Sequence, residues 1–262
     1  MRSSVFILFC VTLLAALLLS CQPAPPTEAA ATVEAPSDPL AQPLSSDPLI
    51  AGFQQTTVAS VSDAVDQITG QRGYMDYDMR PWIGQAFVGR AVTALVKPAK
   101  PEDSTPATAV QHPVRMIDEA EPGSVGVIVF ENGKDIAALG GLMATAAKAR
   151  GMAGMVLDGA IRDIEEVGRI GLPVFARAAS PANAVGRFAS VSKNEPVTCA
   201  GVTVRPGDII VAGLDGVIVV PQDKAAAVLK RAQEIDVRES KMVPFIEREK
   251  SLQKAVKKFN RI

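Results

Sequence analysis

An arginine and an aspartate stand side by side where a buried strand is expected to end. Arg162 and Asp163 follow the apolar segment MVL at 155–157, and Asp158 comes directly after that segment. Ligands of parallel α/β sheets bind beyond the carboxyl ends of the strands, so these side chains are expected to face a crevice. A guanidinium presents a planar fork to a carboxylate or oxyanion, and an aspartate can hold a divalent cation. The same pair could instead form a structural helix cap and salt bridge.

A glycine pair precedes this segment and starts an apolar helix pattern. Gly140 and Gly141 come directly before a helix expected over 142–150. The backbone N–H groups of Leu142 and Met143 would then lack an intrahelical acceptor and could receive a carboxylate or phosphate. Glycine pairs also occur in ordinary turns, and the segment matches neither GxxxxGK[ST] nor GxGxxG. The pair therefore indicates an anion site only in combination with other residues.

Residue counts narrow the chemistry further. The chain has one histidine, His112, which stands in a polar, proline-rich segment, and its three cysteines show no CxxC spacing. A zinc site of imidazoles and thiolates and a nucleophilic triad both lack the residues they need. Any metal would therefore be a hard cation held by carboxylates, water and substrate oxygens. A net charge of −1 without a Lys/Arg block argues against a nucleic-acid partner.

Elements with α/β alternation position these residues. Helical and strand-like patterns alternate over most of the chain, which predicts an α/β fold with a largely parallel core sheet. The expected helices cover 58–68, 142–150 and 164–170, with a short one after Pro113, and the expected strands cover 85–98, 125–130, 155–157 and 173–177.

The last part of the chain shows a different pattern. Turn dipeptides between 196 and 221 predict three short antiparallel strands, and from Asp223 onward the pattern is a charged amphipathic helix interrupted by Pro244. The predicted fold is a compact α/β/β swivelling-type domain with a central mixed sheet and a long C-terminal helix. That helix is long enough to reach a neighbouring subunit.

The N-terminal segment predicts export. Arg2, the run VFILFCVTLLAALLL and Ser20-Cys21 have the order of a signal peptide. LLLSC resembles the lipobox of bacterial lipoproteins, in which the cysteine is lipidated, so residues 1–21 are predicted to be a lipoprotein signal with Cys21 as the anchor. A plain secretory signal is the alternative, whereas a transmembrane helix would need about 20 apolar residues.

The predicted organisation has three parts. Residues 22–50 are rich in Pro, Ala and Ser and are predicted to be a disordered linker, and 51–262 form the folded domain. Cys199 would remain as a lone cysteine without a disulfide partner. The protein is therefore expected to be extracytoplasmic, anchored by lipid to a bacterial membrane at the periplasmic side or the cell surface.

Several motifs in order resemble the RraA-like family. They are GRAVTA, GGLMATAAKARGMAGMVLDGAIRD, LPVFAR, RPGDIIVAGLDGVIVVP and the charged C-terminal helix. The family contains divalent-metal aldolases for 4-hydroxy-4-methyl-2-oxoglutarate, which also decarboxylate oxaloacetate, and the protein inhibitor of ribonuclease E. The resemblance implies a homotrimer or hexamer with active sites between subunits, acting on a small 2-oxo acid.

The resemblance also implies roles for individual residues. Asp163 would hold Mg²⁺, or another divalent cation such as Mn²⁺, through a mostly water-filled shell, and Arg162 would stabilise a pyruvate enolate. The glycine turn would bind the substrate carboxylate through the backbone amides of Leu142 and Met143. A glutamate of a neighbour's C-terminal helix would complete the site, with Glu239 the best match and Glu234 the competitor.

One position departs from the family pattern. The aldolases usually carry an acidic residue where this chain has Gly141, and losing an acid/base group often costs 10²–10⁴-fold in rate. The expected function is nevertheless a metal-dependent lyase that cleaves a C–C bond of a 2-oxo acid, because the Arg162-Asp163 pair is intact. The alternative is a non-catalytic RraA-like binding or scaffolding lipoprotein.

Overall fold

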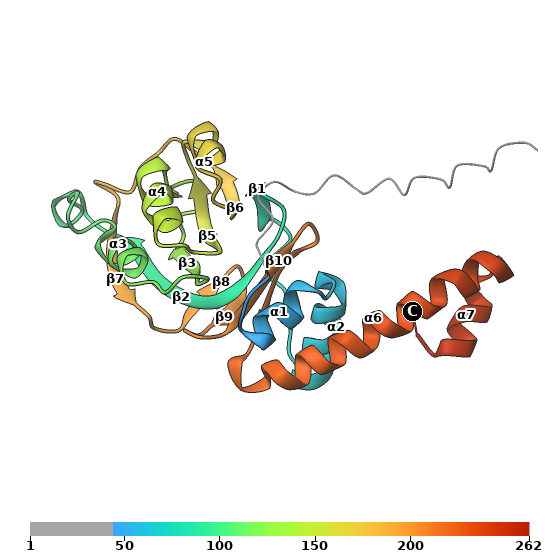
Figure 1. Cartoon of the computed structure of the whole chain (residues 1–262). Coiled ribbons are helices and arrows are strands. Elements are labelled where there is room, and N and C mark those ends of the chain that lie inside the picture. Colours follow the sequence, from blue (N-terminus) through green and yellow to red (C-terminus); the bar gives the residue numbers. More distant parts are fainter. Residues whose placement is uncertain (1–43, 262) are drawn as a thin grey trace, which may run out of the picture. The chain divides into compact units, whose positions relative to one another are not determined.

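The computed structural model describes residues 44–261 (Figure 1). The predicted signal peptide, Cys21 and most of the predicted linker lie outside the described residues. The first described helix, α1 (Pro48–Gln54), begins inside the segment that the sequence assigns to the linker. Its start is capped by the Asp47 side chain, which accepts a hydrogen bond from the Leu49 backbone at 2.9 Å. Ile50 and Phe53 are buried, which explains why the chain orders there.

Within residues 44–261 the central sheet is mixed. Its strand order is β1-β6-β5-β3-β2-β10-β11, with β4 paired to β5 and β7 paired to β2. The inner pairs β6-β5, β5-β3 and β3-β2 are parallel, and the pairs β1-β6, β2-β10 and β10-β11 are antiparallel. The strands are β1 (Arg80–Ile83), β2 (Phe87–Pro98), β3 (Val125–Phe130), β4 (Ala137–Leu139), β5 (Gly154–Ile161), β6 (Val174–Ala179), β7 (Phe188–Lys193), β10 (Ile209–Gly213) and β11 (Gly216–Val220), and β8 (Val197–Cys199) and β9 (Val202–Val204) form a separate hairpin.

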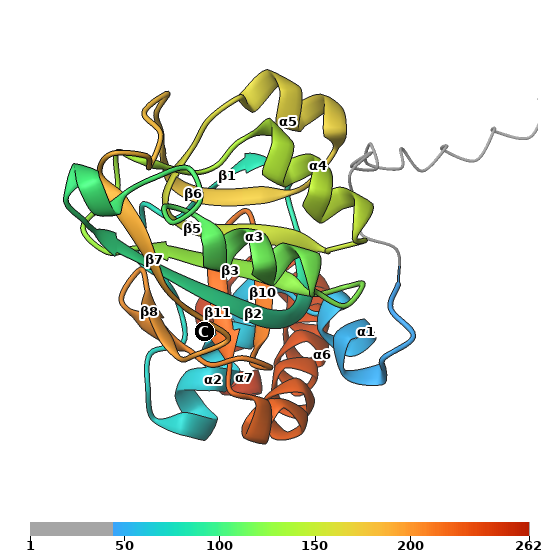
Figure 2. The ribbon, with the colours of Figure 1, turned by 90° about the vertical axis from the view of Figure 1, so that its left-hand side faces the viewer.

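Helices cover two different parts of this sheet. Figure 2 shows α3, α4 and α5 grouped together and α1, α2 and α6 grouped apart from them. One core lies between the first group and β3 to β6, and another lies between the second group and β10 and β11. The remaining helices are α2 (Val58–Thr69), α3 (Gln111–Asp118), α4 (Gly141–Ala149), α5 (Ile164–Ile170), α6 (Ala225–Glu249) and α7 (Leu252–Phe259), with short 3₁₀ turns at Pro101–Asp103 and Gln222–Lys224.

The position of β3 between two cores explains why its sequence is apolar throughout. Val125, Val127 and Val129 face the core that includes the β8-β9 hairpin, whereas Ile128 and Phe130 face the core under α3 and α4. A strand covered on both faces needs no polar alternation. The predicted α/β class, mixed sheet and C-terminal helix are confirmed.

Strand β5 is longer than the sequence indicated, and this changes the place of Asp158. The expected strand ended at 157, but β5 continues to Ile161 because β4 and β6 pair with Ala160 and Ile161. Asp158 therefore lies within the strand, and the expectation that it sits beyond the strand end is wrong. Of the three charged residues, only Arg162 and Asp163 lie beyond the end of β5.

The other differences concern boundaries and short elements. Four strands rather than three occupy the segment after 196, and β1, β4 and β7 were not predicted. His112 lies in the first turn of α3 rather than in a loop. The C-terminal helix continues through Pro244, and its interruption occurs at Lys250, which has a left-handed backbone (φ 49°).

The end of α6 is held by α7. Phe245 and Phe259 pack edge to face with their ring centroids 5.5 Å apart, and Arg261 pairs with Glu239 at 2.6 Å. Figure 1 shows α6 extending past α1 and α2, with α7 beside its far part. In the part of the chain that the structure describes, no helix is long and apolar enough to cross a membrane.

Candidate active site

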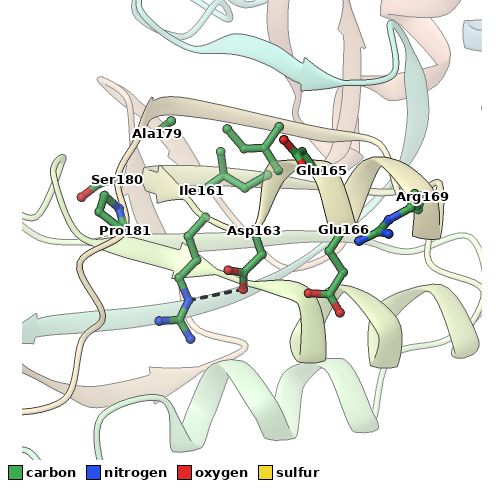
Figure 3. A pocket seen from close by; sticks show the side chains of 10 residues that line it. Ile161, Asp163, Glu165, Glu166, Arg169, Ala179, Ser180 and Pro181 are labelled. Carbon is green, nitrogen blue, oxygen red and sulfur yellow. Dashed lines mark ion pairs between the residues drawn. The ribbon is translucent and has the colours of Figure 1, made fainter.

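Residues that follow β5 and β6 line an open cavity of about 630 Å³ (Figure 3). Arg162 and Asp163 come from the end of β5, Glu166 and Arg169 come from α5, and Ser180 follows β6. This position beyond the carboxyl ends of two parallel strands is where α/β sheets bind ligands. The cavity thus contains Arg162 and Asp163, the pair that the sequence singles out.

Backbone hydrogen bonds fix the turn that carries the Arg162-Asp163 pair. The Arg162 N–H donates to the Leu139 carbonyl at 3.0 Å, which ties the turn to β4. The Asp163 carbonyl accepts from the Val167 N–H at 2.9 Å, which starts α5. Two acidic residues in the first turn of α5, Arg169 in its last turn and a left-handed Gly171 after it favour this short helix.

Asp163 has an unusual backbone and an unusual side-chain partner. Its φ of 55° is left-handed, a conformation that aspartate tolerates better than most residues but still at a cost of about 1–3 kcal/mol. Its side chain makes no capping bond to α5. Instead, Oδ2 accepts a hydrogen bond from the Gly141 N–H at 3.0 Å, at the start of α4. The turn therefore directs the carboxylate toward α4.

Arg162 and Asp163 form a contact with each other in the open cavity. Arg162 Nε lies 3.5 Å from Asp163 Oδ2, and both side chains are about two-fifths exposed. Both described contacts of the carboxylate use Oδ2. The exposed ion pair itself contributes little to stability.

Close packing explains the glycine pair at the start of α4. A Cβ on Gly140 would lie 2.7 Å from Asp163 Oδ2 and 2.9 Å from Arg162 Nε. A Cβ on Gly141 would lie 2.5 Å from the Glu166 carboxyl carbon. Neither position has the left-handed backbone that favours glycine, since Gly140 has φ −137° and Gly141 lies within α4. Instead, the side chains of three cavity residues, Arg162, Asp163 and Glu166, occupy the space beside the two glycines and would have to move to admit a Cβ.

The predicted residues are only partly brought together. Gly140 and Gly141 contact the Arg162-Asp163 turn, and the Leu142 and Met143 amides follow in the same first helical turn, where helix geometry provides no acceptor. The side chains of Leu142 and Met143, however, line a separate apolar hollow of about 170 Å³ beside α3. Any role of these two residues in the site is restricted to their backbone.

Glu239 and Glu234 do not line this cavity in the single chain. Glu239 pairs with Arg261, which also contacts Asp63 at 2.6 Å, and Glu234 pairs with Arg231 at 3.0 Å. Both glutamates lie on α6, which packs on α1 and α2 rather than on α4 or α5. Their predicted role depends on a neighbouring subunit and stays a prediction.

The donor set suits one kind of cation. Among residues 44–261, no three His, Cys, Asp or Glu side chains are grouped to hold a metal ion. Asp163 offers one carboxylate that lines the cavity and is about two-fifths exposed, and this fits a cation such as Mg²⁺, which keeps several waters and needs few protein ligands. Asp163 would be the direct ligand, and substrate oxygens would supply others.

Asp158 belongs to a different cluster. It pairs with Arg177 at 3.1 Å and accepts from the Ala200 N–H at 2.6 Å, while Arg177 also contacts Asp78 at 2.7 Å and Asp76 at 3.3 Å. Arg177 has only 7% of its side chain exposed. Burial lowers the pKa of Arg177, but Asp78 and Asp158 outweigh it and raise that pKa above its usual value. The cluster links β5 and β6 to the β8-β9 hairpin.

Cys199 lies beside this cluster and is not a nucleophile. It is a free, fully buried cysteine, and burial together with the nearby Asp158 charge raises the pKa of its thiol well above the usual range. A thiol that stays protonated is a poor nucleophile and a poor metal ligand.

Comparison with known proteins shows the family of this chain. The family described as RraA-like, Aldolase/RraA, matches residues 58–219. The chain belongs to the RraA-like family. It is 32% identical over 197 residues to a Halalkalibacterium halodurans protein named "Putative 4-hydroxy-4-methyl-2-oxoglutarate aldolase", covering 70% of this chain and 81% of that protein.

Solved structures share the RraA-like fold. An uncharacterized protein from Pseudomonas syringae pv. tomato DC3000 has a TM-score of 0.70 at 29% identity, covering 79% of this chain and 92% of that one. Streptomyces coelicolor RraAS2, described as an unusual member of the RNase ES inhibitor RraA protein family, has a TM-score of 0.66 at 26% identity, covering 76% and 98%. The family thus includes proteins named as aldolases and proteins named as ribonuclease inhibitors.

The sequence pattern did not single out four polar residues that line the cavity of this RraA-like chain. They are Glu165, Glu166 and Arg169 on α5 and Ser180 after β6, and charges on a short helix resemble an ordinary solvated face. One signal was present, because Asp163 and Glu166 are three residues apart, the spacing of the N-cap and N3 positions at the start of a helix. Figure 3 shows both side chains pointing toward α4, whereas Glu165 points away from them.

Proposed function

We propose that this RraA-like protein is a divalent-metal-dependent lyase that cleaves a C–C bond of a 2-oxo acid through a pyruvate enolate. The observation that carries the proposal is the Arg162-Asp163 turn, which places a guanidinium and a partly open carboxylate together in one cavity beside the start of α4. The aldolase name of the Halalkalibacterium halodurans relative supports the same reaction class.

The residues divide the work as follows. Asp163 would hold Mg²⁺ or Mn²⁺, which would supply a Lewis acid for the keto group of the substrate when bound. Arg162 donates hydrogen bonds to the oxygen on which negative charge develops when the C–C bond breaks. The Leu142 and Met143 amides, at the positive end of the α4 dipole, receive the substrate carboxylate. Positioning by several fixed donors favours cleavage over simple binding.

A neighbouring subunit completes this proposal. We propose a homotrimer or hexamer in which Glu239, or Glu234, of an adjacent chain approaches the cavity. Glu239 would have to leave or share Arg261 to do so, since the two side chains are paired within the described chain. The protein is also proposed to be anchored through Cys21 on the extracytoplasmic side of a bacterial membrane.

Pyruvate release tests the proposed activity. The domain is incubated with oxaloacetate and with a panel of 4-hydroxy-2-oxo acids, with Mg²⁺, with Mn²⁺ and with EDTA. We expect pyruvate with either cation and none with EDTA, and we expect Asp163→Ala to abolish release by removing the direct carboxylate ligand. Asp223→Ala, which removes an aspartate with 73% of its side chain exposed outside the cavity, is the matched control.

The outcome also decides between the lyase and the alternative, a non-catalytic binding or scaffolding protein. No release from any substrate, with Mn²⁺ binding intact, would refute the lyase and favour the binding or scaffolding role. Equal release by Asp163→Ala and the control would refute the assigned metal site.

A further inference from the structure

We propose that Glu166 is the proton-transferring carboxylate of this site, and that it takes the place of the acidic side chain that is missing at position 141. The inference rests on the proposed lyase function. Glu166 lies in the first turn of α5 and lines the same cavity as Arg162 and Asp163.

The space beside Gly141 carries the argument. A Cβ on Gly141 would lie 2.5 Å from Glu166 Cδ and 2.8 Å from Glu166 Oε1. The carboxylate of Glu166 therefore occupies the volume that a side chain at position 141 would enter. The absence of an acidic residue on α4 is matched by the presence of one that reaches the same point from α5.

The reaction needs such a group. Aldol cleavage of a 4-hydroxy-2-oxo acid requires a base to remove the proton of the C4 hydroxyl. Glu166 accepts this proton, the C4–O bond becomes a carbonyl, the C3–C4 bond breaks, and its electron pair forms the C2–C3 double bond of pyruvate enolate. Water then protonates C3 of the enolate and Glu166 releases its proton to water, which gives pyruvate and regenerates the carboxylate.

The other cavity carboxylates suit the role less well. Asp163 already contacts the Gly141 N–H and Arg162 through Oδ2 and is the proposed cation ligand. Glu165 points away from the start of α4 (Figure 3). Glu166 has no ion pair within residues 44–261, so its carboxylate is not engaged by a competing cation of the described chain.

Decarboxylation of oxaloacetate provides an internal comparison. That reaction also forms pyruvate enolate, but carbon dioxide leaves and no hydroxyl proton has to be removed. A residue that serves only as the proton acceptor is therefore needed for aldol cleavage and not for decarboxylation. A residue that merely shapes the cavity would affect both reactions alike.

The experiment measures both reactions in Glu166→Gln, with Glu165→Gln as the matched control on the same helical turn. The probes are 4-hydroxy-4-methyl-2-oxoglutarate, oxaloacetate and Mn²⁺ alone. We expect Glu166→Gln to lower kcat for aldol cleavage by about 10²–10⁴-fold. Decarboxylation and the Kd for Mn²⁺ should change by less than about threefold, because a loss confined to proton transfer leaves binding intact.

A double variant that moves the carboxylate from position 166 to position 141 provides the second test. Glu166→Ala should lose aldol cleavage, and Gly141→Asp in the Glu166→Ala background should regain at least about tenfold of it, since the new carboxylate enters the vacated space. Gly141→Asp alone should not help, because two carboxylates would then compete for one volume.

Each result decides the inference. Unchanged aldol cleavage in Glu166→Gln, an equal loss in both reactions, or no recovery in the double variant would overturn the role of Glu166 while leaving the lyase in place. A wild type that decarboxylates oxaloacetate but does not cleave the hydroxy acid would also overturn it. A wild type that releases pyruvate from neither would overturn the proposed function as well.

Discussion

Gly140→Ala tests whether the candidate site depends on the space beside α4. The added Cβ would lie 2.7 Å from Asp163 Oδ2 and 2.9 Å from Arg162 Nε, and contacts this short cannot persist. The atoms that must move are the ends of two flexible side chains rather than backbone. The substitution should therefore displace the reactive groups and leave the fold in place.

The expected effects on stability nearly cancel. Gly140 is the N-cap of α4, where replacing glycine by alanine costs several tenths of a kcal/mol to about 1 kcal/mol. Its extended backbone (φ −137°, ψ −175°) suits alanine, and the smaller entropy of the unfolded chain contributes about 0.4–1 kcal/mol in the opposite direction. The net change should stay within about 1 kcal/mol, or about 2–4 °C in Tm. Displacing catalytic groups by about 1 Å can cost about 10²-fold in rate.

The measurement combines pyruvate release, Mn²⁺ affinity and thermal unfolding. Gly140→Ala should lose about 10²-fold in kcat/KM and bind Mn²⁺ more weakly, with little change in Tm. Gly168→Ala is the control, because it adds a methyl group on α5 with only an ordinary contact, 3.7 Å from Ile83 Cδ1. That variant should keep its activity and unfold at the same or a slightly higher temperature. A Gly140→Ala protein with wild-type activity and Mn²⁺ affinity would refute the geometry proposed for the site.

Four further predictions concern other parts of the molecule. Arg162→Lys should lose most of the pyruvate release despite its retained charge, because an ammonium lacks the planar fork, and a wild-type rate would contradict this. Arg177→Met should lower the free energy of unfolding by about 3 kcal/mol in denaturant titrations, because it leaves partly buried carboxylates unpaired. An unchanged free energy of unfolding would refute a stabilising role of this cluster. Burial disfavours ionised Asp78, but Arg177 and Lys134 outweigh burial and lower the pKa of Asp78 in the folded protein. The stabilisation from ionised Asp78 is therefore complete above the ordinary aspartate pKa and is lost as the pH falls through the lower pKa of the folded state. Arg177→Met should remove this dependence of stability on acid pH. Fatty-acid labelling should mark the wild type but not Cys21→Ser, and label in the variant would refute the lipobox.

Local sequence patterns were sufficient to predict several of the elements around the candidate site. The helix α5 was predicted with its actual bounds, and so was the apolar strand β3, because caps, charge placement and uninterrupted apolar runs are properties of neighbouring residues. The Arg162-Asp163 pair was recognised for the same reason. The end of β5 was not predicted, since pairing with β4 and β6 extends that strand through residues with no strong strand pattern.

Contacts between distant segments decided the rest. Asp158 seemed to belong to the site until the structure placed it against Arg177, 19 positions away in sequence. Glu166 was not considered, because only the packing of α5 on α4 shows that its carboxylate fills the space beside Gly141.

The sequence alone determined the fold class and the RraA-like resemblance and predicted Arg162 and Asp163 as the pair that performs chemistry, because residue types, spacing and periodicity carry that information along the chain. Only the tertiary structure decided which side chains share the cavity. That arrangement depends on strand pairing and helix packing between segments far apart in sequence, and no local pattern encodes the direction in which a carboxylate points.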